Sequence, residues 1–250
     1  MAASWGSSQR WRLVRITQEQ LKRLRHRHRG YQITLATEVL LLLLLPLAQG
    51  HPWLLSVMLV LLALLLIVFV SRYSPLRQTR PLIYGLGALA IGLEILWHGA
   101  LIQAPGLGRM LTVPHVFEWL VFLSVGVFRK VKTLAREPYV TASVVLGAAS
   151  GYLLIGLAGW LLLTSLWAVQ PAAFVLASLP QVQAGNSIDL AVAPALMAAS
   201  FTLLTTVGTT ILKTSNVAGQ VVTTVITILG QLYVAILIAL ILGRYHRRST

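Results

Sequence analysis

Long apolar runs separated by short polar connections constrain this chain more than any other feature. Six such runs occur along its 250 residues. Each is a candidate to cross a hydrocarbon core of about 30 Å, although the first and fourth are short. Hydrophobic residues make up 57% of the chain and charged residues only 10%, which excludes an ordinary soluble domain. The sequence predicts an all-α integral membrane protein with six transmembrane helices, over residues 33–48, 53–70, 82–102, 113–128, 140–169 and 219–242.

Basic residues fall almost entirely on one side of this six-span arrangement. Of the 20 Lys and Arg residues, only Arg109 and Lys213 fall on the other side. Cytoplasmic segments of membrane proteins carry an excess of Lys and Arg, so we expect both termini to be cytoplasmic. This distribution explains the net charge of +14 without a nucleic-acid partner. The expected partner is the lipid bilayer, in a prokaryotic plasma membrane or another internal membrane.

The connections divide the chain into three segments. Residues 1–31 form a basic cytoplasmic segment, residues 32–137 form a four-helix transmembrane unit, and residues 138–250 form a second unit. Connections within the four-helix unit, such as 49–52, are short, so neighbouring helices should be antiparallel. The basic stretch 129–137 is expected to link the two units.

The second unit holds a polar stretch between apolar segments. Residues 191–201 form an apolar run too short to cross a bilayer, and residues 204–220 are rich in Thr and Gly. Backbone groups in lipid need partners, so such a loop is tolerated only where it is buried in protein or lines water. We therefore predict a re-entrant helix, which enters the membrane and turns back, followed by a functional loop.

The loop and both of its flanks carry motif residues: Phe201, Thr205, Thr206, Val207, Gly208, Gly219 and Gly-Gln-Leu-Tyr at 230–233. In this order they resemble the pore module of the potassium-channel superfamily, in particular bacterial two-helix-pore proteins with four extra N-terminal spans. Residues 140–166 are similar to the outer pore helix of that group. The resemblance implies a homotetramer around a selectivity filter at 205–210. It also implies potassium or another monovalent cation in the filter, with no cofactor and no resident metal.

The second half of the expected filter departs from the family pattern. The family has Tyr-Gly-Asp where this chain has Thr209, Thr210 and Ile211. Glycine permits the backbone torsions that aim successive carbonyls at an ion, whereas a strained β-branched residue there costs of order 1–3 kcal/mol per copy. We expect Thr206, Val207 and Gly208 to keep the inner ion sites while the outer half takes another shape.

The predicted pore mouth is also electrostatically unusual. Ile211 replaces the family's acidic residue and Lys213 follows it, so four copies would place a ring of positive charge at the mouth. Asp189, the one acidic residue on the extracytoplasmic side of this topology, would partly offset that charge if its loop folds over it. We expect altered or reduced potassium selectivity. The fourth span has no ladder of basic residues, which argues against voltage sensing.

Several ionisable residues lie inside predicted spans, where they are expensive and are candidates for function. Glu94 and His98 are four residues apart and His115 and Glu118 three apart, so each pair shares a helix face. The two pairs should meet across the third and fourth spans. Two interpretations stay open: a site that senses protons or a divalent metal, and hydrogen bonding that holds the helices together. Glu38 lies in the first span.

Two other residue types allow simpler interpretations. Gly230 in the last span is either a hinge or a point of close helix packing. The tryptophans mostly fall near predicted span ends and are expected to act as interfacial anchors: Trp53, Trp97, Trp119, Trp160 and Trp167.

No nucleotide-binding loop, His-Glu metal motif or nucleophile elbow is present in the sequence, so an enzyme is not expected. Two alternatives to a conducting channel remain. One is a nonconducting pseudo-channel or interaction subunit, with a channel or another membrane complex as its partner. The other is a small ion-coupled or proton-coupled transporter.

Overall fold

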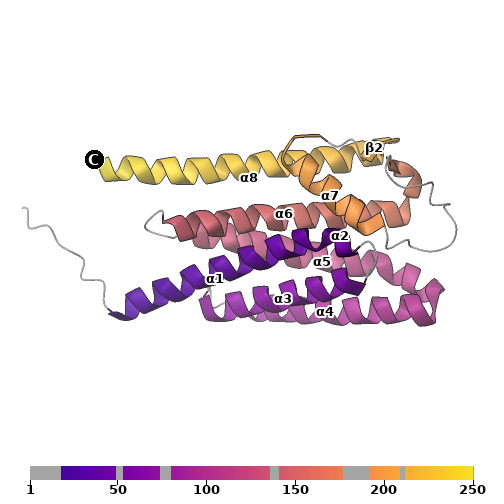
Figure 1. Ribbon diagram of the computed structural model, residues 1–250, viewed down its shortest axis with the longest axis horizontal. Helices are drawn as coiled ribbons and strands as arrows, with labels where there is room; N and C mark the ends of the chain where they lie inside the picture. The colour runs from indigo at the N-terminus through magenta and orange to yellow at the C-terminus, as the bar shows by residue number, and fades with distance from the viewer. Residues whose placement is uncertain are drawn as a thin grey trace, which may run out of the picture.

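The computed structural model describes residues 18–48, 53–73, 80–135, 141–176, 192–208 and 212–249, and nearly all of them are helical. This confirms the predicted all-α class (Figure 1). The helices are α1 (Gln18–Leu43), α2 (Leu45–Ala48), α3 (Trp53–Tyr73), α4 (Arg80–Gln103), α5 (Pro105–Leu134), α6 (Ala142–Val169), α7 (Ala193–Leu204) and α8 (Val217–Ser249). A short 3-10 helix, η2 (Pro171–Ala173), precedes two strands that the sequence did not predict, β1 (Phe174–Leu176) and β2 (Leu212–Thr214).

Four of the described helices are long and apolar enough to cross a membrane. They cover Arg80–Gln103, Gly106–Leu134, Ala142–Val169 and Val217–Leu240. The apolar part of α3 is shorter, at Ser56–Phe69. The structure therefore shows an integral membrane protein by length and composition of its helices.

Two helices extend beyond the predicted spans. The predicted fourth span, 113–128, lies inside the longer helix α5, and Arg129 and Lys130 are buried in that helix instead of forming a link. The predicted boundary at residue 31 falls within α1, which is continuous from Gln18. The boundary at 137 and the first 17 residues lie outside the described residues.

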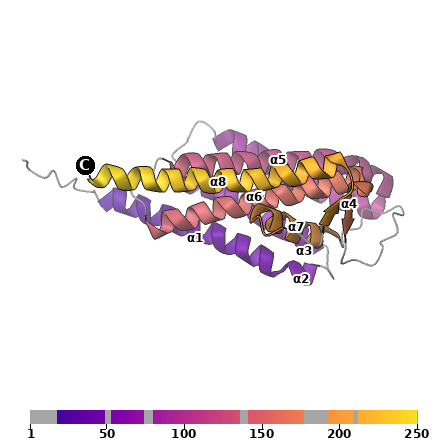
Figure 2. The same ribbon diagram turned by 90° about the horizontal axis from the view of Figure 1, so that it is seen from above.

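Helix α6 is the central element of the bundle. It packs against α1, α5, α7 and α8, and in Figure 1 it lies between α8 above it and α3 and α4 below. Figures 1 and 2 both place the beginning of α1 and the end of α8 at the same end of the bundle. Elements from both predicted units therefore meet on one helix.

Glycines explain how α6 accepts so many neighbours. A Cβ atom added at Gly147 would lie 2.8 Å from the ring of Tyr31, and one at Gly159 would lie 2.6 Å from Ser200 Oγ. Gly151 is in the same position against Tyr233 of α8, and Gly156 against Phe201 of α7. Small residues allow helices to approach closely in a membrane, where lipid offers no hydrophobic driving force for association.

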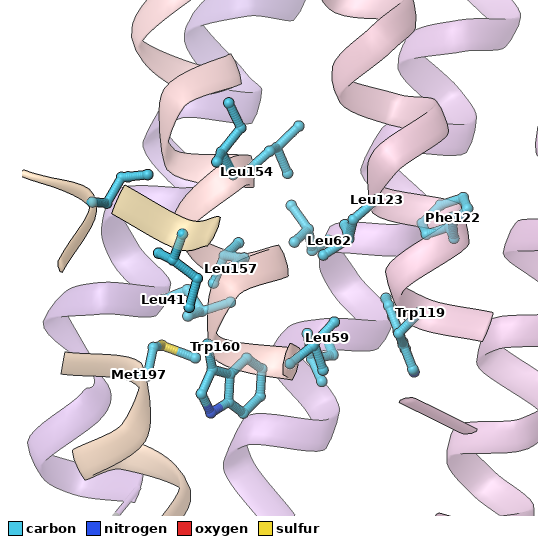
Figure 3. Packing of buried hydrophobic residues seen from close by; sticks show 14 of the residues in the cluster. Leu41, Leu59, Leu62, Trp119, Phe122, Leu123, Leu154, Leu157, Trp160 and Met197 are labelled. Atoms are coloured by element: carbon cyan, nitrogen blue, oxygen red, sulfur yellow. The ribbon is translucent and has the colours of Figure 1, made fainter. Parts of the chain in front are cut away.

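Between these contacts, large apolar side chains interdigitate (Figure 3). Leu154, Leu157 and Trp160 of α6 are buried among residues of the other helices. The same cluster includes Leu41 of α1, Leu59 and Leu62 of α3, Leu123 of α5 and Met197 of α7, and on the far side of α5 it continues to Trp119 and Phe122. Dispersion contacts of this kind hold α6 in place once the glycines have allowed the close approach.

The segment from α7 to β2 runs into the bundle and returns. Ser200 of α7 lies against Gly159 of α6. Helix α7 then ends at Leu204, whose carbonyl oxygen lies beside Tyr152 of α6 and Gly230 of α8. Tyr152 is about 25 Å from the end of α6 at Val169, given a rise of 1.5 Å per residue.

Strand β2 lies back at that end of α6. It pairs antiparallel with β1, with Phe174 opposite Thr214 and Val175 opposite Lys213. The chain therefore reaches about three-fifths of the length of α6 before it turns back.

The close contacts of α6 predict that the same Gly→Ala replacement has different effects on the free energy of unfolding at two positions. Gly156→Ala should lower the free energy of unfolding by about 1–3 kcal/mol, because the added methyl overlaps the Phe201 ring. Gly92→Ala on the open face of α4 should leave it unchanged or raise it by about 0.5–1 kcal/mol. Thermal unfolding of the two purified variants in one detergent measures the difference; equal melting temperatures would contradict the packing role of α6.

Candidate functional site

The candidate site begins with α7, a helix of 12 residues. Pro194 lies in its first turn, where a missing N–H group does no harm, and Ala, Leu and Met fill most of the remaining positions. Leu196, Met197 and Leu204 are buried against the neighbouring helices. Helix α7 therefore has a fixed position from which the following loop, Thr205–Gly208, projects.

The last carbonyl of α7 joins three helices. The hydroxyl of Tyr152 on α6 donates a hydrogen bond of 2.9 Å to Leu204 O. This carbonyl lies in the last turn of α7, where carbonyls have no partner within the helix. A Cβ atom at Gly230 of α8 would lie 2.6 Å from the same oxygen. The geometry thus gives Gly230 a packing reason, and its role as a hinge stays a prediction.

The backbone of the loop has an unusual sequence of torsions. Thr206 has φ +59° and Gly208 has φ +81°, whereas Val207 between them is not in the positive region. Among the described residues, Thr206 is the only residue other than glycine with a positive φ. The φ angle therefore changes sign at each step from Thr206 to Gly208.

The loop is exposed in a single copy of the chain. Thr205, Thr206, Val207 and Gly208 are all exposed, and Val207 is 81% exposed although it is apolar. The Thr205 hydroxyl donates to Phe201 O at 2.9 Å, and the Thr206 hydroxyl donates to Thr205 O at 2.7 Å. Both hydroxyls therefore donate locally and keep their lone pairs, as the exposed carbonyl oxygens of the loop do.

The predicted outer half of the filter is only partly described. Thr209, Thr210 and Ile211 lie outside the described residues, and so does Asp189. Lys213 belongs to β2, opposite Val175, and its side chain is exposed. The Ser215 hydroxyl donates to Ala172 O, and Ser215 N donates to Ala173 O at 3.0 Å. These contacts hold the return segment to the end of α6.

The polar residues of α4 and α5 form a second, separate site. His115 Nε2 lies 2.6 Å from Glu94 Oε2, and Trp119 Nε1 donates to the same carboxylate oxygen at 2.9 Å. The ring of Trp97 stacks on His115, with centroids 4.5 Å apart and planes inclined by 7°. All four side chains are buried. Glu94 and His115 thus meet between the two helices, as the sequence predicts.

The other two members of the predicted cluster lie elsewhere. His98 Nδ1 is 3.2 Å from Ser56 Oγ on α3, and buried Glu118 Oε1 has no hydrogen-bond partner in the described part of the chain. Among the same residues, no group of three or more His, Asp or Glu side chains could hold a metal ion. The bonds of Glu94 to His115 and Trp119 join α4 to α5. His115 Nδ1 is buried without a partner among the described residues, and proton sensing stays a prediction.

Sequence reasoning missed the aromatic residues that support both sites. Trp97 and Trp119 are buried and bonded, Trp97 through its Nε1 to Thr112 Oγ1 at 3.0 Å, so interfacial anchoring is the wrong description for them. Their spacing offered a signal, because Trp119 follows His115 by four residues and shares its helix face. Tyr152 gave no comparable signal, since its partner is a backbone carbonyl 52 residues away.

Comparisons of the chain with protein-family models, with curated proteins and with solved structures gave no match.

The Leu204 junction predicts a specific loss from removal of one hydroxyl. Tyr152→Phe should lower the free energy of unfolding by about 1–3 kcal/mol, because the carbonyl at the end of α7 loses its partner. Thr164→Val serves as the matched control, because its hydroxyl bonds only to Trp160 O within α6, and this variant should change that free energy by less than about 0.5 kcal/mol. Thermal unfolding in detergent compares the two, and equal effects would contradict a supporting role for Tyr152.

The buried pair on α4 and α5 predicts non-additive effects. Glu94→Leu should destabilise the protein by about 3–5 kcal/mol, because His115 and Trp119 lose their common acceptor. The double variant Glu94→Leu, His115→Leu should be less destabilised, since it leaves fewer buried polar groups unpaired. Melting temperatures of the single and double variants test this pairing, and a fully additive loss would argue against it.

Proposed function

We propose that this protein forms a potassium-channel-like pore, in which four copies surround the Thr205–Gly208 loop and pass a monovalent cation. The observation that carries the proposal is the half-depth helix α7, which ends in a loop whose φ angles alternate in sign. Rings of backbone carbonyls select ions by replacing the hydration shell, and a ring needs several copies of such a loop. The resemblance of residues 140–245 to potassium-channel pore modules leads to the same proposal.

The end of α7 adds a favourable field. A helix carries partial negative charge at its C-terminus, and α7 ends at Leu204, immediately before the loop. In a tetramer four such termini would point toward the same region about halfway along the bundle. A cation that has lost part of its water would be stabilised there.

Helix α8 supplies a reason for assembly. Only 17% of its membrane-spanning window is buried in one copy of the chain. Gln220, Thr224, Thr227 and Gln231 recur at intervals of three and four residues and therefore share one helix face. Polar side chains in a membrane face protein or water instead of lipid. In the proposed tetramer this polar stripe of α8 faces the central axis, and the neighbouring apolar residues face other subunits and lipid.

The proposed topology extends the four membrane-spanning helices to six spans. Helices α1 and α3 would complete the set, with α7 as a re-entrant pore helix. Arg80, Arg129 and Lys132 lie at helix ends on the side where α8 ends, and Arg109 lies at the opposite side. The excess of basic residues supports the proposal that both termini are cytoplasmic, and the proposed membrane is a prokaryotic plasma membrane.

A nonconducting pseudo-channel is the second candidate, and Lys213 is the observation that favours it. Its side chain is exposed at the end of the bundle from which α7 enters. Four copies would form a basic ring that repels cations. Thr209, Thr210 and Ile211, in place of Tyr-Gly-Asp, also disfavour a complete filter. In this case the tetramer would modulate a conducting partner.

Ion flux from liposomes separates the two functions. The natural protein is compared with the variant Thr209→Tyr, Thr210→Gly, Ile211→Asp, which restores the family pattern. We expect weak or poorly selective potassium flux from the natural protein and selective flux from the variant. Strong selectivity for potassium over sodium in the natural protein would refute the altered filter, and no flux from either would favour the interaction subunit.

The φ angle of Gly208 predicts a second effect on flux. Gly208→Ala adds a methyl group into open space, so its effect comes only from the positive φ, at a cost of order 1–3 kcal/mol per copy. We expect flux to be lost while the oligomer stays intact by size-exclusion light scattering.

Gly106→Ala is the matched control, since it also has open space but no positive φ. This variant should conduct like the natural protein. Equal flux from Gly208→Ala and Gly106→Ala would contradict a role for the loop in conduction.

A further inference from the structure

A buried lysine joins three helices on the side of the bundle where α8 ends. The Lys130 side chain on α5 is 1% exposed, and its Nζ donates to Glu38 Oε1 and Thr34 Oγ1 of α1, each at 3.4 Å. It also donates to Ser150 Oγ of α6. We call Thr34, Glu38, Lys130 and Ser150 the Lys130 cluster. Its members come from both predicted units of the chain.

The cluster satisfies the ammonium group completely. An ammonium has three donors, and here each donor has a different acceptor. Glu38, Thr34 and Ser150 are themselves at most 1% exposed. A charge inside a membrane protein is costly unless it is paired, so these four side chains strongly favour one relative position of α1, α5 and α6.

The same turn of α6 also holds α8. Ser150 is flanked by Gly151, against which Tyr233 packs, and the Tyr233 hydroxyl donates to Ala148 O at 2.7 Å. Tyr233 follows Gly230, the residue that touches Leu204 O at the base of the candidate loop, by three residues. A displacement of α6 at Ser150 would therefore move the contact that positions α8.

Free space borders the cluster on its other side. A cavity of about 10 Å³ is lined by residues of α3, α4 and α5, including Phe69, Arg129 and Lys130. The Lys130 Nζ lies 6.0 Å from the Phe69 ring centroid, so the side chain already borders an aromatic wall. This volume is about that needed for a single water molecule, and neither α1 nor α6 lines it.

We propose that the Lys130 cluster couples the four N-terminal helices to the pore module. When the bonds of Lys130 are formed, α1 and α5 hold α6, and α6 holds α8 through Tyr233. When they open, α8 is released from the N-terminal helices. The consequence for ion flux rests on the proposed function, whereas the positional coupling does not. Lys130 acts here as a positioning residue, because it touches no part of the loop.

The test measures the position of α8 directly. The chain has no cysteine, so two introduced cysteines, at Leu64 of α3 and Leu232 of α8, can carry spin labels without a background. Labelled protein is mixed with excess unlabelled protein in nanodiscs, so that only pairs within one chain contribute. Pulsed dipolar spectroscopy then gives the distance distribution in the otherwise natural sequence, in Lys130→Met and in Lys130→Met, Glu38→Met. The double variant leaves no unpaired charge and should therefore fold.

Glu94→Gln is the control, since it perturbs a buried pair that involves only α4 and α5. We expect one narrow distribution in the natural sequence and in Glu94→Gln, and a shifted or broadened one in both Lys130 variants. Unchanged distributions in a double variant that melts at the natural temperature would overturn the coupling.

Flux separates this inference from the proposed function. If the protein conducts, the double variant should change the rate of flux by roughly tenfold, as expected for an ordinary coupling energy. Shifted distances without flux from any variant would support the coupling and contradict the proposed channel function. Selective flux with unchanged distances would support the channel function and contradict the coupling.

Discussion

Close approach to helix α6 is the constraint on which the rest of the structure depends. Tyr31, Tyr233, Phe201 and Ser200 each meet α6 where a glycine leaves room, and a methyl group at any of these four positions would overlap its neighbour. In lipid, helices gain little from hiding apolar surface, so packing and hydrogen bonds decide their arrangement. The glycines of α6 therefore determine where α7 ends and along which line α8 runs.

Polar groups refine this arrangement at two depths. Near one end, strands β1 and β2 tie the return segment to the end of α6. About 25 Å along α6, Tyr152 bonds Leu204 O, and Ser150, two residues before it, accepts from Lys130, which also bonds α1. Each contact satisfies groups that would otherwise be unpaired in an apolar environment. The proposed filter loop is therefore supported from α6 while its own backbone stays exposed.

The sequence predicted the all-α, membrane-spanning class and a separate short helix near 191–201, because span length and apolar run length are local signals. It also predicted the meeting of Glu94 and His115, since helical spacing and antiparallel packing bring them together. It placed Lys130 in a link and Trp119 at an interface, because burial depends on neighbours distant in the chain. The bond from Tyr152 to Leu204 O was equally hidden, since a backbone acceptor leaves no mark in a sequence.

The central claim is that four copies meet around the loop after α7, and the geometry of a labelled oligomer tests it most directly. A single spin label at Lys213→Cys in the cysteine-free chain should give two inter-subunit distances in a ratio of about 1.4, the diagonal to the side of a fourfold ring. A label at Ile102→Cys, on the exposed face of α4, should give longer distances because α4 lies across α6 from α8. A single distance, no distance, or shorter distances at position 102 would contradict the account.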